Sequence, residues 1–208
     1  MHKFRSRGLY VITDCQRLDF PALYRITEDI LVAGVPVLQY RDKTAEPEIR
    51  RERALSLLDL CNRHDTLFVV NDDVHLAQAI GAAGAHIGED DMPFTRARQM
   101  LGEQSIIGIS CYNRLEPARA AQSQGADYIA FGAFFSTLTK AGTVTAGLDL
   151  LREAKSALTL PVVAIGGITP ENGAALIQAG ADLLAVANSI YGSSDPGRTV
   201  EKFNSLFL

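Results

Sequence analysis

The sequence predicts a single (β/α)8 TIM barrel, and three features of its pattern point to this fold. Short apolar runs rich in β-branched residues alternate with longer segments of helical periodicity along the whole chain. The 208 residues hold about eight such units, or roughly 26 residues per unit, which is near the lower size limit of this fold. No linker rich in Pro, Ser or Gly divides the chain, so we expect one domain over residues 1–208.

Strands are expected at the apolar runs, several of which are uninterrupted, as is typical of strands buried on both faces of a parallel sheet. A doubly wound sheet is the competing architecture. It is disfavoured because no G-x-G-x-x-G motif follows the first run. The predicted strands are residues 9–13, 35–40, 67–70, 85–87, 106–109, 128–131, 162–165 and 183–186.

Apolar residues at helical spacing lie between the expected strands. The two clearest stripes are Leu23, Ile26, Ile30 and Leu31, and then Ala54, Leu57, Leu58 and Cys61. The second stripe places Cys61 between a helix and the barrel, where it acts as a small apolar residue. We expect helices to end in the left-handed conformation at the glycines that precede four strands, namely Gly34, Gly84, Gly125 and Gly180.

The charge balance argues against general binding to polyanions. The chain has 20 Lys and Arg residues against 24 Asp and Glu residues, a net charge of −4. A mildly acidic protein is not expected to bind nucleic acid or an anionic membrane surface. Any anion that it binds must therefore meet a local cluster of cations. Nothing in the composition indicates an oligomeric state.

Cysteine usage and the N-terminus predict a reduced, cytoplasmic protein. The three cysteines are far apart, which matches neither a disulfide framework nor a C-x-x-C metal site. The N-terminus is basic, but the apolar run at residues 9–12 is too short for a signal peptide. No apolar run approaches the 18 or so residues that a membrane span needs.

In a barrel of this kind the active site lies where strands end and the following loops begin. The second strand ends in Gln39-Tyr40-Arg41-Asp42-Lys43. Alternation along an extended segment places Gln39, Arg41 and Lys43 on one side and Tyr40 and Asp42 on the other. Two cations and an amide at the barrel mouth predict an anion site. The alternative is a solvated strand end that carries an Arg–Asp pair.

Acidic residues follow the next two strands, with Asp72 and Asp73 after the third and Asp90 and Asp91 after the fourth. Each pair could simply cap a following helix. Neighbouring strands lie about 4.8 Å apart, however, so that one carboxylate from each can reach a shared cation. Carboxylate oxygens without cysteine or paired histidine suit Mg²⁺, which completes its shell with water and substrate phosphate.

The two histidines of this region are expected to be structural. His75 falls in the helix after the third strand. His86 falls within the fourth strand, where a hydrogen-bonded core imidazole is the favoured interpretation over a metal ligand.

Polar residues also follow strands five and six. Ser110 ends the fifth strand, but no His–Asp pair accompanies it to make it a nucleophile. After the sixth strand, a hydroxyl-rich loop contains Thr137, Leu138 and Thr139 and ends in Lys140. That composition indicates either an anion-binding loop or an ordinary polar surface loop.

The seventh strand ends in Gly166 and Gly167, followed by Thr169 as a helix N-cap and Pro170 as the first helical residue. Two glycines before a helix allow backbone N–H groups to approach a phosphate. The residues thus predict two anion sites in one mouth, a Mg²⁺-dependent diphosphate site and a monophosphate site. We interpret this combination as the joining of two phosphorylated substrates, with diphosphate leaving from one.

These motifs resemble the thiamine-phosphate synthase family from Leu9 to about Ile190. Each of them lies at a strand end, and they occur in the order of the family. The blocks that carry the resemblance are Gln39-Tyr40-Arg41-Asp42-Lys43, Asn71-Asp72, His86-Ile87-Gly88 with Asp91, Gly108-Ile109-Ser110, Thr137-Leu138-Thr139-Lys140 and Ile165-Gly166-Gly167-Ile168.

The resemblance implies a (β/α)8 enzyme that joins hydroxymethylpyrimidine diphosphate to thiazole phosphate, forming thiamine phosphate and diphosphate. It also implies that diphosphate departs first and leaves a pyrimidine-stabilised carbocation. By the resemblance, Asp72 and Asp91 hold Mg²⁺, and the catalytic residues are Arg41, Lys43, Ser110 and Lys140. Substrate contacts are expected from Gln39, Tyr40, Arg41, Asp42, Lys43, Asn71, Ser110, Thr137, Leu138, Thr139, Lys140, Gly166, Gly167, Ala187 and Asn188.

The chain departs from the family pattern at two places. Glu89 stands where many members have Gln, which is expected to add negative charge near the metal. Ala187-Asn188 stands where a Val-Ser pair is common, although an Asn amide can still donate to phosphate.

Three other functions remain in competition. A thiazole tautomerase-like isomerase has a similar fold but no need for Arg41, Lys43, Asp72, Asp91 and Lys140. A phosphosugar isomerase or epimerase would need a general acid–base pair. A non-catalytic thiamine-phosphate-binding barrel would lack turnover.

Overall fold

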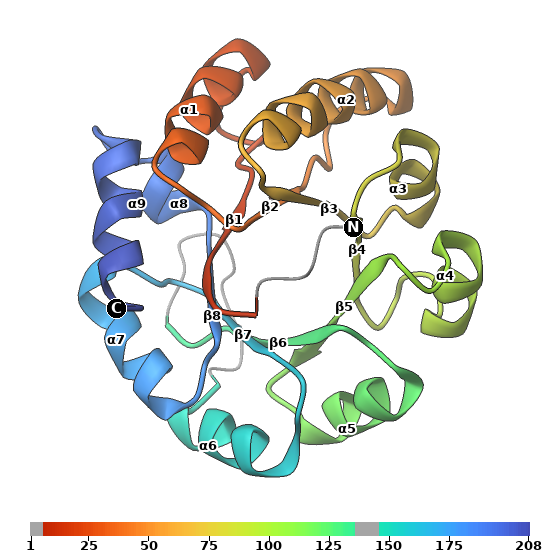
Figure 1. Ribbon diagram of the computed structural model, residues 1–208, viewed down its shortest axis with the longest axis vertical. Coiled ribbons are helices and arrows are strands. Elements are labelled where there is room, and N and C mark those ends of the chain that lie inside the picture. Colours follow the sequence, from red (N-terminus) through yellow and green to blue (C-terminus); the bar gives the residue numbers. More distant parts are fainter. Residues whose placement is uncertain (1–5, 136–145) are drawn as a thin grey trace.

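The computed structural model describes residues 6–135 and 146–208, and within these residues eight parallel strands close into a barrel in chain order. Figure 1 shows the strands as an inner ring with the helices outside it. The predicted TIM barrel is therefore confirmed. The strands are β1 Gly8–Ile12, β2 Val37–Tyr40, β3 Leu67–Asn71, β4 Gly84–Ile87, β5 Ile106–Tyr112, β6 Tyr128–Gly132, β7 Val162–Ile165 and β8 Leu183–Val186.

Two strands differ clearly from their predicted bounds. β2 begins at Val37 rather than at residue 35, because Pro36 has no N–H to donate to a neighbouring strand. β5 continues to Tyr112, past the expected end at residue 109. A register shift against β6 between Ser110 and Tyr112 accompanies the longer strand, as a β-bulge would produce.

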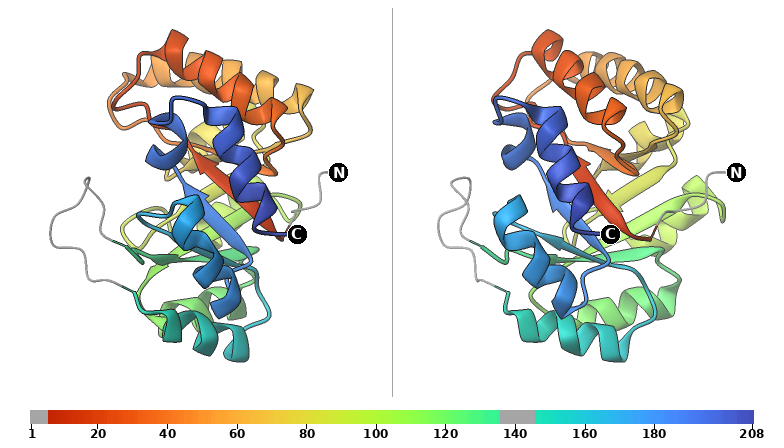
Figure 2. Two further views of the ribbon diagram at one scale, coloured as in Figure 1. Left: turned by 90° about the vertical axis from the view of Figure 1, so that its left-hand side faces the viewer. Right: turned by 60° about the vertical axis from the view of Figure 1, so that its left-hand side comes forward.

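The described helices pack around the outside of the strands (Figure 2). Asp side chains cap several of them: Asp19 accepts from the Ala22 amide at 2.9 Å and Asp73 from the Leu76 amide at 2.9 Å. The helices are α1 Phe20–Val32, α2 Pro47–Arg63, α3 Val74–Ile80, α4 Phe94–Leu101, α5 Leu115–Gln124, α6 Leu148–Ala157, α7 Pro170–Ala179, α8 Asn188–Tyr191 and α9 Pro196–Ser205. His75 lies in α3, as predicted.

The glycine prediction is correct at three positions and wrong at the fourth. Gly34, Gly125 and Gly180 have positive φ angles at helix ends. Gly84 instead begins β4, and α3 ends in the left-handed conformation at Gly81. The reason for glycine at position 84 is steric, because a Cβ there would lie 1.8 Å from the carbonyl oxygen of Ile106.

The core has two layers. One layer fills the barrel interior with side chains such as Tyr10, Val69 and Tyr128, and the other lies between the strands and the helices. Cys61 is fully buried in the outer layer, as predicted. Within α2, Ala54, Leu57 and Cys61 of the predicted stripe are buried in that layer, Leu58 is partly buried against it, and Leu60 joins them.

No helix within the described residues is both long enough and apolar enough to cross a membrane.

The close approach of β4 to β5 gives a stability prediction. Gly84→Ala should lower the free energy of unfolding by about 3 kcal/mol, because the new Cβ forces the β5 backbone away. Gly197→Ala is the control, since a Cβ there meets nothing closer than 3.8 Å in the first turn of α9. Urea denaturation midpoints measure both changes. Equal midpoints for the two variants would contradict the steric explanation.

Candidate active site

A cavity of about 320 Å³ opens where the strands end. Charged and polar side chains from the ends of β2 to β5 form its rim, and mainly apolar side chains from the barrel interior form its floor. The rim residues are Gln39, Arg41, Lys43, Asn71, Asp72, His86, Gly88, Asp90, Asp91, Ser110 and Tyr112. The floor residues are Tyr10, Ile12, Tyr128, Ala130, Val163, Ile165 and Ala185.

The end of β2 shows the predicted alternation. Gln39, Arg41 and Lys43 line the main cavity, whereas Tyr40 and Asp42 line a smaller cavity of about 290 Å³ on the α2 and α3 side, which Lys43 also borders. Tyr40 is 1% exposed, and its ring stacks on Phe68 in the outer core layer. Tyr40 and Asp42 were expected to contact substrate, but their side chains face away from the main cavity.

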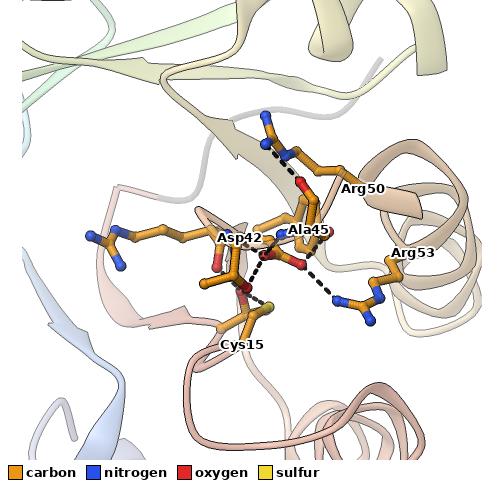
Figure 3. Close-up of polar contacts among 9 residues, drawn as sticks. Cys15, Asp42, Ala45, Arg50 and Arg53 are labelled. Carbon is orange, nitrogen blue, oxygen red and sulfur yellow. Dashed lines mark hydrogen bonds and ion pairs between the residues drawn. The ribbon is translucent and has the colours of Figure 1, made fainter. Parts of the chain in front are cut away.

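Asp42 organises the loop between β2 and α2. Its carboxylate accepts hydrogen bonds from the amides of Thr44 and Ala45, from the Thr44 hydroxyl and from Arg53, each at 3.0 Å. Burial alone would raise the pKa of Asp42, but these hydrogen bonds outweigh it and lower the pKa to about 2. Figure 3 shows Asp42 at the centre of this cluster. We interpret Asp42 as a residue that positions Arg41 and Lys43.

Thr13 and Arg53 complete this support, and sequence reasoning missed both. The Thr13 hydroxyl accepts from the Arg41 amide at 2.8 Å and donates to the Arg41 carbonyl at 3.2 Å. This pair of bonds ties the end of β2 to the end of β1. Only the position of Thr13 at a strand end could have indicated its role, since Thr is common in strands.

The acidic residues divide into caps and cavity residues. Asp73 is the N-cap of α3, so the capping alternative is correct for that residue. Asp72 instead lines the cavity, with its Oδ2 atom 3.1 Å from Nζ of Lys43. Asp91 also lines the cavity and accepts from the Gly88 amide at 2.7 Å, whereas the N-cap position of α4 is Pro93.

The carboxylates of Asp72 and Asp91 lie side by side. Burial raises the pKa of Asp91, and a hydrogen bond to Asp72 and the charge of Asp72 raise it further, against the Gly88 amide and Lys43. In the ranges that the structure describes, no group of three or more His, Cys, Asp or Glu side chains is placed to hold a metal. Two adjacent carboxylates fit Mg²⁺, which binds through one or two of them, and do not fit a structural zinc site.

His86, Ser110 and Tyr128 line the same cavity as Asp72 and Asp91 and are joined by hydrogen bonds. His86 is 8% exposed, with Nδ1 lying 3.0 Å from the Tyr128 hydroxyl and Nε2 lying 2.9 Å from the Ser110 hydroxyl. Burial lowers the pKa of His86 to about 4, although the charge of Asp91 raises it. The predicted hydrogen-bonded core imidazole is therefore confirmed. Sequence reasoning missed Tyr10 and Tyr128, because apolar strands commonly contain tyrosine.

The glycine pair after β7 has the backbone geometry that a close approach needs. Gly166 and Gly167 have φ angles of +107° and +63°, and no described residue accepts a hydrogen bond from either amide. Thr169 caps α7 and Pro170 begins it, as predicted. The Thr169 amide donates to Asn172 at 2.8 Å, so it is not available to a ligand. The Gly166 and Gly167 amides are the ones that remain for an anion.

Comparisons with known proteins agree with this geometry. A family model described as thiamine monophosphate synthase matches residues 9–190. A thiamine-phosphate synthase of Thioalkalivibrio sulfidiphilus is 47% identical over 98% of this chain and 96% of its own. The chain belongs to the thiamine monophosphate synthase family. As a member of this family, it is an enzyme of the transferase class.

Two further relatives lead to the same family. A thiamine-phosphate synthase of Nitrosospira multiformis is 47% identical over 96% of this chain and 85% of its own. The solved structure of a thiamine phosphate pyrophosphorylase from Pyrococcus furiosus has a TM-score of 0.87 and 32% identity, and the match covers 97% of this chain and 96% of the other.

The first departure from the family pattern, Glu89, does not face the expected metal site. Its carboxylate forms an ion pair with Arg114 and is absent from the cavity lining. The expected increase in negative charge near the metal is therefore reduced by the Arg114 charge.

At the second departure, Ala187 is the N-cap of α8 and Asn188 is its first residue. The side-chain oxygen of Asn188 accepts a hydrogen bond from Arg17, which also lies 3.6 Å from Asp14. With Oδ1 engaged, the Nδ2 amide of Asn188 is the group left to donate to an anion. The expected contacts at Thr137, Leu138, Thr139 and Lys140 lie outside the described residues.

The depressed pKa of Asp42 predicts how stability depends on pH. A carboxyl whose pKa falls from its ordinary value near 4 to about 2 stabilises the folded state above pH 4 by roughly 2 kcal/mol, and this contribution is lost as pH falls to 2. Asp42→Asn should therefore be less stable than the wild type at pH 6, with the difference shrinking between pH 4 and 2. Chemical denaturation at several pH values measures it. A difference that does not change with pH would contradict the assignment.

Proposed function

We propose that the chain is a thiamine-phosphate synthase that joins a hydroxymethylpyrimidine diphosphate to a thiazole phosphate, forming thiamine phosphate and diphosphate. The single observation that carries this proposal is the grouping of Arg41 and Lys43 with the Asp72–Asp91 pair at one edge of the cavity. Cations and a carboxylate pair at one edge match a diphosphate bound together with a divalent metal. An isomerase acting on a monophosphate has no need of such a pair.

The diphosphate contacts Arg41, Lys43, Asn71 and Ser110 in this proposal. These groups lie on β2, β3 and β5 or directly after them, and all line the same cavity. Arg41 and Lys43 supply the local positive charge that a chain of net charge −4 needs to bind a polyanion. Lys140, which the family resemblance assigns to the same substrate, joins them as a fifth donor to the leaving group.

Asp72 and Asp91 hold Mg²⁺ in this proposal. Burial raises the pKa of Asp91, and the neighbouring Asp72 carboxylate raises it further. A divalent cation held by the two carboxylates would offset the repulsion between them. When bound, Mg²⁺ supplies electrostatic stabilisation of the negative charge that grows on the departing diphosphate.

Bond cleavage precedes bond formation in the proposed mechanism. The C–O bond to the pyrimidine methylene breaks, diphosphate leaves with the electron pair, and the resulting carbocation is captured by the lone pair of the thiazole nitrogen. Hydrogen-bond donors and cations aimed at the leaving oxygens lower the barrier to the first step. The apolar floor residues Ile12, Ala130, Val163 and Ala185 exclude water that would otherwise capture the cation.

The thiazole phosphate lies on the other side of the mouth in this proposal. The free amides of Gly166 and Gly167 and the Nδ2 amide of Asn188 donate to its phosphate. Ala187 and the loop residues Thr137, Leu138 and Thr139 complete the contact. Gly166, Gly167, Ala187 and Asn188 are not among the residues that line the cavity, although Ile165, directly before Gly166, is. The two anions are thereby assigned to separate parts of the barrel mouth.

Turnover decides between this proposal and a non-catalytic binding barrel. The purified protein is mixed with both phosphorylated precursors and Mg²⁺, and thiamine phosphate and diphosphate are measured. Stoichiometric appearance of both products supports the synthase. Isomerisation of a thiazole precursor without condensation would support a tautomerase-like isomerase instead.

The carboxylate pair gives a metal prediction. Asp72→Asn or Asp91→Asn should lower turnover about a hundredfold, or roughly 3 kcal/mol of transition-state stabilisation, and should raise the Mg²⁺ concentration needed for half-maximal rate. Asn suits position 72, because it tolerates the φ of +63° found there. Asp59→Asn on the outer face of α2 is the control for charge alone. Equal rates with and without Mg²⁺ would reject the shared-metal site.

Because the two anions are assigned to separate places, a substitution near one of them should change the KM of that substrate alone. Asn188→Ala should raise KM for the thiazole phosphate by about fivefold, or about 1 kcal/mol, and leave KM for the pyrimidine diphosphate nearly unchanged. Gly167→Ala should act in the same direction, since its φ of +63° disfavours Ala and a methyl group would hold the phosphate away from the amide. Titration of each substrate separately measures the effect. A parallel rise in both KM values would show that the anions are not separated in this way.

A further inference from the structure

Five hydrogen-bonded side chains that line the cavity form a row, and the direction of its hydrogen bonds bears on the proposed reaction. The row joins five strands by four hydrogen bonds: Gln39 Nε2 to Tyr10 at 2.9 Å, Tyr10 to Tyr128 at 2.7 Å, Tyr128 to His86 Nδ1 at 3.0 Å, and His86 Nε2 to Ser110 at 2.9 Å. The first four side chains belong to residues that are at most 8% exposed. Buried polar groups of this kind are costly unless every donor and acceptor is paired.

The number of protons on each group determines which atom donates and which accepts at each hydrogen bond of the row. The Gln39 Nε2 group can only donate, so the Tyr10 oxygen accepts from it. Burial raises the pKa of both phenols, and each phenol therefore keeps its single proton. The Tyr10 proton is directed to the Tyr128 oxygen, and the Tyr128 proton is directed to Nδ1 of His86.

The same counting continues through the imidazole ring. Because Nδ1 accepts from Tyr128, it carries no proton, and the one proton of the neutral ring is on Nε2. Nε2–H then donates to the Ser110 oxygen. The Ser110 hydroxyl, having accepted from His86, turns its own proton away from the row. Ser110 lines the cavity on the edge where Lys43 and Asp91 lie.

We propose that Tyr10, Tyr128 and His86 are positioning residues that commit the Ser110 hydroxyl to donate into the cavity, toward an anionic oxygen of the departing diphosphate. This inference rests on the proposed function. A hydroxyl that can rotate freely spends part of its time with a lone pair facing the anion. The row removes that orientation, so that the donor is in place before charge develops on the leaving oxygen. Gly108 belongs to the same arrangement, because a Cβ there would lie 2.0 Å from the Tyr128 ring.

The tautomer of His86 tests the direction without any substrate. In ¹⁵N-labelled, ligand-free protein, NMR should show His86 with a protonated Nε2 and an unprotonated Nδ1 at neutral pH. The signal is assigned by its loss in His86→Asn. If the Gln39 amide were reversed, every hydrogen bond in the row would reverse, and the proton would be on Nδ1. An Nδ1–H tautomer would therefore overturn the proposal.

Kinetic coupling tests the effect on the reaction. Tyr10→Phe and Ser110→Ala, whose side chains are not in contact, should each lower kcat about tenfold. The double variant should be no slower than Ser110→Ala alone, because the row acts only through Ser110. Tyr128→Phe gives a second cycle and keeps the ring that packs against Gly108. Multiplicative losses in both cycles would overturn the positioning role.

A matched control separates this role from stability. Thr66→Val removes another buried hydroxyl, which donates to the Val35 carbonyl at 2.7 Å at the opposite end of β3. It should lower the unfolding midpoint without changing kcat or either KM. A loss of kcat in Thr66→Val equal to that in Tyr10→Phe would count against the proposal. Absence of turnover in the wild type would reject the proposed function, whereas the His86 tautomer would still report the direction of the row.

Discussion

Closure of eight parallel strands into a barrel brings the carboxyl end of every strand to one rim, and the candidate site depends on that constraint. Asp72 and Asp91 are far apart in the chain, yet they become adjacent carboxylates because β3 and β4 are neighbours. The same closure brings the loops after β1 and β8 together, so that Arg17 reaches Asn188. An open sheet with the same strand order would keep the Asp72–Asp91 pair but would separate Arg17 from Asn188, because β1 and β8 would be its two edges.

Local supports hold the charged rim in place. Asp42, fully buried behind Arg41 and Lys43, uses its oxygens for the loop between β2 and α2 rather than for a ligand. Thr13 joins the backbone of Arg41 to β1. Neither Asp42 nor Thr13 pairs with the charged groups of Arg41 and Lys43. Within residues 6–135 and 146–208, Lys43 forms an ion pair with Asp72 and Arg41 forms none. That ion pair is the one that a metal on Asp72 would weaken.

Polar groups inside the barrel have a cost that an apolar core would avoid. Tyr10, Tyr128 and His86 occupy positions where most TIM barrels place branched apolar side chains. Each of their polar atoms in the row is paired, which limits the desolvation penalty and holds the rings in one arrangement. Polar side chains in the barrel interior thus cost more to bury than apolar ones, but they give the hydrogen bonds there a defined orientation.

Sequence alone determined the barrel, most strand bounds, the alternation at Gln39, Arg41 and Lys43, and the start of α7. These features follow from periodicity, capping and turn chemistry, which act over a few residues. Tertiary structure alone decided which acidic residue caps and which faces the cavity, since Asp72 and Asp73 look alike until α3 begins. It also decided that Gly84 serves a contact with β5 rather than a helix end, and that Tyr10 and Tyr128 meet across the barrel. Those outcomes depend on contacts between residues distant in the chain, and such contacts leave no local pattern.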